Sequence, residues 1–331
     1  MRRRTLLGGL VATATGAVTG YATTRQQPAA AGSRAALTDV MASTKTSRLA
    51  PRDVTAYVPP AGWAPAHRHA VGLRDFGFAR GADRPLPTRV WYPATGSADH
   101  AVTAAATPAP GPYPIVLFSH GLSSQPNDYA ELLTAWARAG FVVAAPIYPH
   151  TSYGTADLNT YDIANQPADA SAVLTQLLAL NGGGDPLSGH LDAGRAGAAG
   201  HSAGGITTAG LFSAARDARL KAGLLLAGTD FRSAPFAGPP AALLMVNGTK
   251  DETVAYAAGR TVFAAIPWSR AMLTVTGGGH EIAAGDIAAV TATTTEFLRW
   301  SLYGDPHARR RLPVRAALGG VAILDDQLGG Y

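Results

Sequence analysis

Short apolar runs alternate with longer amphipathic segments along most of this chain. Residues 114–118 and 141–145 are continuous apolar runs, which is typical of strands buried on both faces. Residues 168–180 and 288–302 place apolar side chains at helical spacing. This alternation predicts an α/β domain with a mostly parallel sheet and helices on both of its faces.

Shorter signals complete the predicted sheet and its first helix. Five further strands are expected, at residues 88–92, 195–200, 224–228, 241–246 and 272–275. A helix should follow residue 128, capped by Asn127 or Asp128. In the predicted helix at residues 168–180, the inward side chains are expected to be those of Ala172, Leu174, Leu177 and Leu178.

The first 55 residues differ in character from the rest. Residues 1–31 combine Arg2, Arg3 and Arg4 with a weakly apolar stretch and a run of alanines, which predicts a twin-arginine-like export signal and a secreted or extracytoplasmic protein. A short membrane anchor is the alternative reading. Residues 32–55 are expected to be a flexible linker and residues 56–331 the catalytic domain. No later run is apolar enough to predict a membrane span in the mature chain.

Cysteine content and charge narrow the possible chemistry. The chain of 331 residues has no cysteine, which excludes a cysteine nucleophile, disulfides and cysteine-ligated metals. Its net charge is +5, but four of these charges belong to arginines in the first 31 residues. The remaining chain is close to neutral and gives no reason to expect a nucleic-acid partner.

The motif that carries chemistry is Gly200-His201-Ser202-Ala203-Gly204. It lies between a predicted strand and a helix of small residues, where a tight turn would raise the serine hydroxyl above the sheet edge. Glycines two positions before and after the serine suit this turn, because a side chain there would clash with neighbouring backbone. The motif therefore predicts Ser202 as a nucleophile.

A serine nucleophile needs a base and an acid from later strand ends. The predicted strand at 241–246 leads to Asp251 and Glu252, and the strand at 272–275 leads to His280. We expect His280 to act as the base and Asp251 to orient it, with Glu252 as the alternative acid. The arrangement requires no metal and no cofactor, and we expect neither.

Backbone amides should stabilise the oxyanion that forms during attack. The Ala203 amide follows the nucleophile directly, and the Leu122 amide lies in the loop after the strand at 114–118. His120, in the same loop, is expected to hold the loop by hydrogen bonding. Residues 148–166 could form a pocket wall or a short lid.

Several stretches together resemble the platelet-activating-factor acetylhydrolase and dienelactone-hydrolase-like family of bacterial α/β-hydrolases. They are residues 87–93, 118–122, 140–146, 166–169, 191–192, 200–204, 248–251 and 277–280. The resemblance implies an α/β-hydrolase fold, a triad of Ser202, Asp251 and His280, and Leu122 and Ala203 as oxyanion donors. It implies secreted polyester hydrolases and chlorophyllase-like enzymes as more distant relatives. Dienelactone hydrolases themselves use a cysteine nucleophile, which this chain lacks.

The predicted function is hydrolysis of carboxylic esters, with short acyl groups as the expected substrates and an acyl-enzyme intermediate. A cutinase-like or acetylhydrolase-like enzyme acting on polyesters or lipids is one alternative. A serine peptidase or amidase on the same fold is another, because the triad does not separate esters from amides. A binding protein without catalytic activity is a third reading, which the presence of all three triad residues disfavours.

Overall fold

The computed structural model describes residues 54–230 and 234–329. The predicted export signal at residues 1–31 lies outside the described residues, as does the predicted linker apart from Val54 and Thr55. Thr55 forms a parallel β-bridge with Trp268. The fold therefore already includes the residue that precedes the expected start of the domain.

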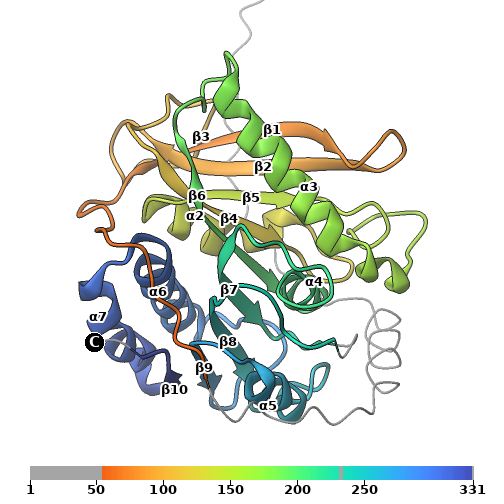
Figure 1. The fold of residues 1–331 in the computed structure, drawn as a ribbon, viewed down its shortest axis with the longest axis vertical. Helices are drawn as coiled ribbons and strands as arrows, with labels where there is room; N and C mark the ends of the chain where they lie inside the picture. The colour runs from red at the N-terminus through yellow and green to blue at the C-terminus, as the bar shows by residue number, and fades with distance from the viewer. Residues whose placement is uncertain (1–53, 231–233, 330–331) are drawn as a thin grey trace, which may run out of the picture.

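A ten-stranded sheet forms the centre of the described structure (Figure 1). Its strand order is β10-β9-β8-β7-β6-β4-β5-β2-β1-β3. The strands are β1 (Ala70–Ala79), β2 (Pro85–Ala94), β3 (Thr103–Ala104), β4 (Tyr113–Ser119), β5 (Val142–Pro146), β6 (Leu191–His201), β7 (Leu220–Leu226), β8 (Ala242–Gly248), β9 (Arg270–Val275) and β10 (Ala322–Gln327). Neighbouring strands in the stretch β9-β8-β7-β6-β4-β5 are parallel. At its two ends, β10 pairs antiparallel with β9 and β2 pairs antiparallel with β5. The predicted mostly parallel sheet is confirmed.

Helices cover both faces of this sheet (Figure 1). They are α2 (Ala130–Arg138), α3 (Gln166–Ala179), α4 (Ala203–Leu211), α5 (Tyr256–Ala265), α6 (Ile287–Leu298) and α7 (Pro306–Ala316). Short 3-10 helices include η1 (Pro126–Tyr129), η2 (Thr160–Ala164), η3 (Leu180–Gly182) and η5 (Leu318–Gly320), and a π-helical turn, η4 (Arg299–Tyr303), follows α6. No helix of the described residues is long and apolar enough to cross a membrane.

Strand β4 explains why the sequence contains a continuous apolar run. Ile115 and Leu117 pack into the core on the face covered by α3, α4 and α5. Val116 and Phe118 pack into the other core, beneath α2, α6 and α7. Because alternate side chains of one strand enter opposite cores, every position must be apolar.

Two local expectations differ from the structure. The buried stripe of α3 consists of Ala170, Val173, Leu174 and Leu177, at i, i+3, i+4 and i+7 spacing, whereas Ala172 and Leu178 are half-buried. The segment before α2 forms η1, and its N-cap is Gln125 rather than Asn127 or Asp128. Asp128 instead accepts a hydrogen bond from the Gln125 amide at 2.9 Å, because it stands at the third position of η1.

Candidate active site

Ser202 lies in a sharp turn between β6 and α4. Its φ of 55° and ψ of −116° place it in a left-handed region that residues with a side chain rarely adopt. A Cβ on Gly200 would come within 2.1 Å of the Gly204 carbonyl oxygen, and a Cβ on Gly204 within 1.9 Å of the Ser119 carbonyl oxygen. Both glycines are therefore required sterically, because the turn crosses other backbone at contact distance.

The structure brings Ser202, His280 and Asp251 together above the carboxyl ends of β6, β9 and β8. The Oγ of Ser202 is 2.8 Å from Nε2 of His280. The Nδ1 of His280 is 2.9 Å and 3.1 Å from the two carboxylate oxygens of Asp251. Since a carboxylate only accepts, Nδ1 carries the proton in the neutral ring, and Nε2 accepts from the serine hydroxyl.

Asp251 is held in place by backbone amides as well as by His280. Its Oδ1 accepts hydrogen bonds from the amides of Thr253 at 2.8 Å and Val254 at 2.7 Å. The residue is buried, whereas Glu252, the alternative acid, is exposed to solvent. Of the two candidate acids, only Asp251 contacts the histidine in the described structure.

The two amides expected to face an oxyanion belong to Ala203 and Leu122. The Ala203 amide opens α4 and is one of the four amides that an α-helix leaves without an intrahelical acceptor. Leu122 follows Gly121, which lies against the elbow: a Cβ on Gly121 would be 3.5 Å from Cβ of Ser202. Both amides therefore come from segments that touch the nucleophile.

His120 is buried and holds the loop that contains Leu122. Its Nδ1 donates to the Gly121 carbonyl at 2.8 Å, and its Nε2 accepts from the Tyr148 amide at 3.2 Å. Burial lowers the pKa of His120 to about 4, so the ring is neutral, as these two bonds require. Because the Gly121 carbonyl and the Leu122 amide share one peptide plane, this bond also sets the direction of that amide.

A second histidine, His201, was not identified from the sequence as part of the site. Its Nε2 lies 2.9 Å from the backbone carbonyl of His280, which can only accept, so the proton is on Nε2. Its Nδ1 then accepts from the Tyr129 hydroxyl at 2.9 Å. That hydroxyl accepts in turn from the Gly121 amide at 3.2 Å. Hydrogen bonds thus connect the loop of His280 to the loop that carries the proposed oxyanion amide of Leu122.

Burial decides the ionisation states of His201 and Tyr129. Burial lowers the pKa of His201, which favours the neutral ring that can both donate and accept. Burial raises the pKa of the Tyr129 phenol, so its proton remains available to His201. The only sequence signal for this network was that His201 directly precedes the serine, since Tyr129 is 72 residues away along the chain.

One group of side chains in the described part of the chain is close enough to share a metal ion. Ligand atoms of His201, His280 and Glu281 lie within 4.8 Å of one another. However, both ring nitrogens of His201 are hydrogen-bonded, and both ring nitrogens of His280 face Asp251 or Ser202. A metal at this position would displace these bonds, so the donor set suits the serine chemistry better.

Comparisons with known proteins agree with this architecture. The model of the family described as chlorophyllase matches residues 86–230, a segment that contains the Leu122 loop and the Ser202 turn and ends before Asp251. No curated protein matches the chain. A solved ferulic acid esterase from Streptomyces cinnamoneus matches with a TM-score of 0.59 and 21% identity, over 75% of this chain and 94% of that chain, which shows a common fold. The chain therefore has the α/β-hydrolase fold, and residues 86–230 are similar to the chlorophyllase family.

Proposed function

We propose that the chain is a serine esterase in which Ser202, His280 and Asp251 act as a catalytic triad. The observation that carries the proposal is the continuous contact from the Ser202 hydroxyl through the His280 ring to the Asp251 carboxylate. A serine hydroxyl is a weak nucleophile at its ordinary pKa, and a neutral imidazole 2.8 Å away is placed to remove its proton.

The reaction would proceed in two steps through an acyl-enzyme. In the first step the Ser202 oxygen forms a bond to the ester carbonyl carbon while its proton passes to Nε2 of His280. The tetrahedral intermediate then breaks its bond to the alcohol oxygen, which takes that proton from His280. In the second step a water molecule repeats the sequence, releasing the acid and restoring the serine.

Two further features support this mechanism. The amides of Leu122 and Ala203 would stabilise the negative oxygen of the tetrahedral intermediate, and each comes from a segment packed on the elbow. Asp251 would stabilise the imidazolium form of His280 without itself becoming protonated.

Short acyl groups are the proposed substrates. Leu122, Ile163, Ala203 and Ile206 form a small cluster of buried side chains beside the two proposed oxyanion amides. Because these apolar side chains already fill that region, they favour an acetyl or similarly short acyl group over a long chain.

The decisive experiment is replacement of the nucleophile. Ser202→Ala should lower the turnover of p-nitrophenyl acetate by about 10⁴-fold or more, as expected when a triad nucleophile is lost. A fluorophosphonate probe should label the unchanged enzyme at Ser202 and leave the variant unlabelled. Undiminished hydrolysis by the variant would exclude the mechanism, and a matched ester and anilide assayed side by side would separate an esterase from an amidase.

We also infer that the enzyme is exported, from the composition of residues 1–31. The test is to express the full chain in a host with an active twin-arginine pathway and to compare it with Arg3→Lys/Arg4→Lys. The unchanged chain should accumulate outside the cytoplasm with a shortened N-terminus, and the double variant should remain inside. Retention of both would contradict export.

A further inference from the structure

Residues 148–166, here called the wall segment, form backbone hydrogen bonds with the loop that carries the Leu122 amide. The amide of Ser123 donates to the Thr151 carbonyl at 2.7 Å, and the amide of Tyr153 donates to the Ser124 carbonyl at 2.9 Å. Farther along the segment, Ile163 of η2 is buried in the cluster that contains Leu122 and Ala203. The wall segment therefore touches the site in two regions, through its first residues and through Ile163.

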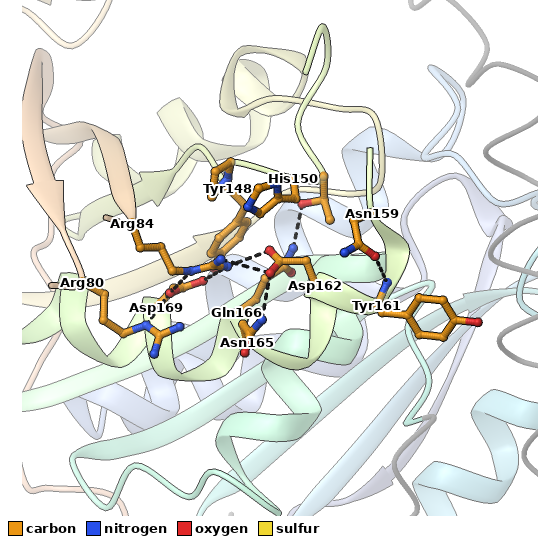
Figure 2. Close-up of polar contacts among 12 residues, drawn as sticks. Arg80, Arg84, Tyr148, His150, Asn159, Tyr161, Asp162, Asn165, Gln166 and Asp169 are labelled. Atoms are coloured by element: carbon orange, nitrogen blue, oxygen red, sulfur yellow. Dashed lines mark hydrogen bonds and ion pairs between the residues drawn. The ribbon is translucent and has the colours of Figure 1, made fainter. Parts of the chain in front are cut away.

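A half-buried arginine, Arg84 in the turn before β2, holds the second of these regions (Figure 2). Arg84 donates two hydrogen bonds to Asp162 of η2, at 3.0 Å and 2.7 Å, and two to Asp169 of α3, at 2.7 Å and 2.5 Å. The side chains are 15%, 5% and 0% exposed, respectively. We call Arg84, Asp162 and Asp169 the clamp.

The two carboxylates of the clamp depend on Arg84 to different degrees. Asp169 also accepts a hydrogen bond from Arg80 at 2.6 Å. Asp162 has Asn165 as its other side-chain donor, at 2.8 Å, and Asn165 belongs to the wall segment itself. Loss of Arg84 would therefore remove the ion pair that joins η2 to the turn before β2, while Asp169 of α3 stays paired with Arg80.

The two ends of the wall segment are fixed independently of the clamp. Gln166 donates to the Thr151 hydroxyl at 2.7 Å and accepts from Thr207 of α4. Tyr148 contacts the Ser119 hydroxyl at 2.8 Å. The clamp therefore controls mainly the part of the wall segment that carries Ile163, the residue that follows Asp162 in the sequence.

We propose that Arg84 is a positioning residue that sets acyl-chain selectivity, because the clamp holds Ile163 against the proposed oxyanion residues. This inference rests on the proposed function, since it assigns a role to residues around the same site. With η2 fixed, the volume beside the oxyanion amides is filled and a long acyl chain is excluded. With η2 released, Ile163 can move outward and the same volume becomes accessible to acyl methylenes.

The test is an acyl-length series of p-nitrophenyl esters, from acetate to hexanoate, measured with folded, purified variants. In Arg84→Met the ratio of kcat/KM for hexanoate to that for acetate should rise by about tenfold, the scale on which apolar pockets discriminate methylenes. Asp162→Asn should change the ratio in the same direction, and it leaves Arg84 paired with Asp169. Ile163→Ala should raise the ratio with the clamp intact.

Two further variants separate positioning from general loss of structure. Arg74→Met removes a comparable double ion pair of β1, with Asp185 at 2.6 Å and 2.9 Å, and should leave the ratio unchanged. Arg84→Lys retains the charge but not the forked geometry, and should give a ratio between those of the unchanged enzyme and Arg84→Met. A merely structural role would lower activity on all the esters equally.

The outcomes are distinct. An unchanged ratio in folded Arg84→Met and Asp162→Asn would overturn the inference, as would an equal change in Arg74→Met. If Arg84→Met does not fold, Asp162→Asn alone decides the matter, because it weakens only the wall side of the clamp. If the ratio is unchanged while the fluorophosphonate labels Ser202 in every variant, only the inference has failed. If the fluorophosphonate does not label Ser202 in the unchanged enzyme, the proposed function itself has failed.

Discussion

The ring of His201 donates a hydrogen bond from Nε2 to the backbone carbonyl of His280, at 2.9 Å. The same His280 places its own Nε2 2.8 Å from the Ser202 hydroxyl. His201 also accepts from the Tyr129 hydroxyl, which accepts from the Gly121 amide. The position of the proposed base is therefore tied to the loop that carries the Leu122 amide through two buried, neutral groups, His201 and Tyr129.

Removal of the Tyr129 hydroxyl should disconnect these two loops. Tyr129→Phe leaves the His201 Nδ1 without its donor and the Gly121 amide without its acceptor. We expect kcat for p-nitrophenyl acetate to fall by about tenfold, which corresponds to about 1.4 kcal/mol, with little change in KM. Steady-state kinetics would test this, and Tyr161→Phe, which removes an exposed hydroxyl, is the matched control. Equal kinetics in the two variants would contradict the expectation.

The choice between the two candidate acids can be tested directly. Asp251→Asn should lower kcat by about 10³- to 10⁴-fold, because the amide favours the wrong tautomer of His280 while the geometry is retained. Glu252→Gln should leave kcat unchanged, since that side chain is exposed. Measured turnover numbers decide the assignment, and the opposite pattern would identify Glu252 as the acid.

Gly204, two residues after the nucleophile, should tolerate no side chain. In Gly204→Ala the new methyl group would lie 1.9 Å from the Ser119 carbonyl oxygen. Because that oxygen belongs to the backbone of β4, it cannot move far enough to relieve the clash without distorting the strand. We expect a loss of at least about 3 kcal/mol of folding stability, measured by urea denaturation. Gly182→Ala, where nothing lies within 4 Å, should unfold at nearly the same urea concentration as the unchanged protein. A fully stable Gly204→Ala enzyme would disprove this account of the turn.

His120 should make stability depend on pH below neutrality. Burial lowers its pKa from 6.5 to about 4, against the opposing effects of the Gly121 carbonyl and Asp128. Between these two values the unfolded chain binds a proton that the folded chain does not, so stability falls as the pH decreases. The folding stability that depends on a neutral His120 is fully present above pH 6.5. It is lost as the pH falls toward 4, and the loss amounts to about 3 kcal/mol.

The measurement is urea denaturation at pH 7.5, 6, 5 and 4.5 for the unchanged protein and for His120→Gln. The variant should lose less stability than the unchanged protein over this range, because it lacks the titrating ring. His67→Gln, at an exposed position, serves as the control and should follow the unchanged protein. Parallel curves for all three proteins would rule out His120 as a source of the pH dependence.

The central strands could be predicted from the sequence, whereas the outer ones could not. Residues 114–118 and 141–145 lie in strands buried on both faces, so an apolar run is obligatory there. β1 (Ala70–Ala79) and β10 (Ala322–Gln327) lie toward the two ends of the sheet and are half-exposed along much of their length. Their mixed sequences carry no continuous apolar run, and only their pairing with β2 and β9 identifies them as strands.

The sequence by itself determined the order of the chemical groups. The Gly200–Gly204 motif encodes a turn whose steric demands are local, and the strand ends that carry Asp251 and His280 are likewise local patterns. Parallel strands bring their carboxyl ends to one edge, so the three groups could be expected to meet.

The tertiary structure alone decided how that site is held. His201 meets Tyr129 across 72 residues, and Arg84 meets Asp162 across 78 and Asp169 across 85. No periodicity or spacing marks such pairs, because their partners are chosen by packing and by the need of buried polar groups for hydrogen bonds. The sequence therefore names the reacting groups, and only the folded chain shows what orients them.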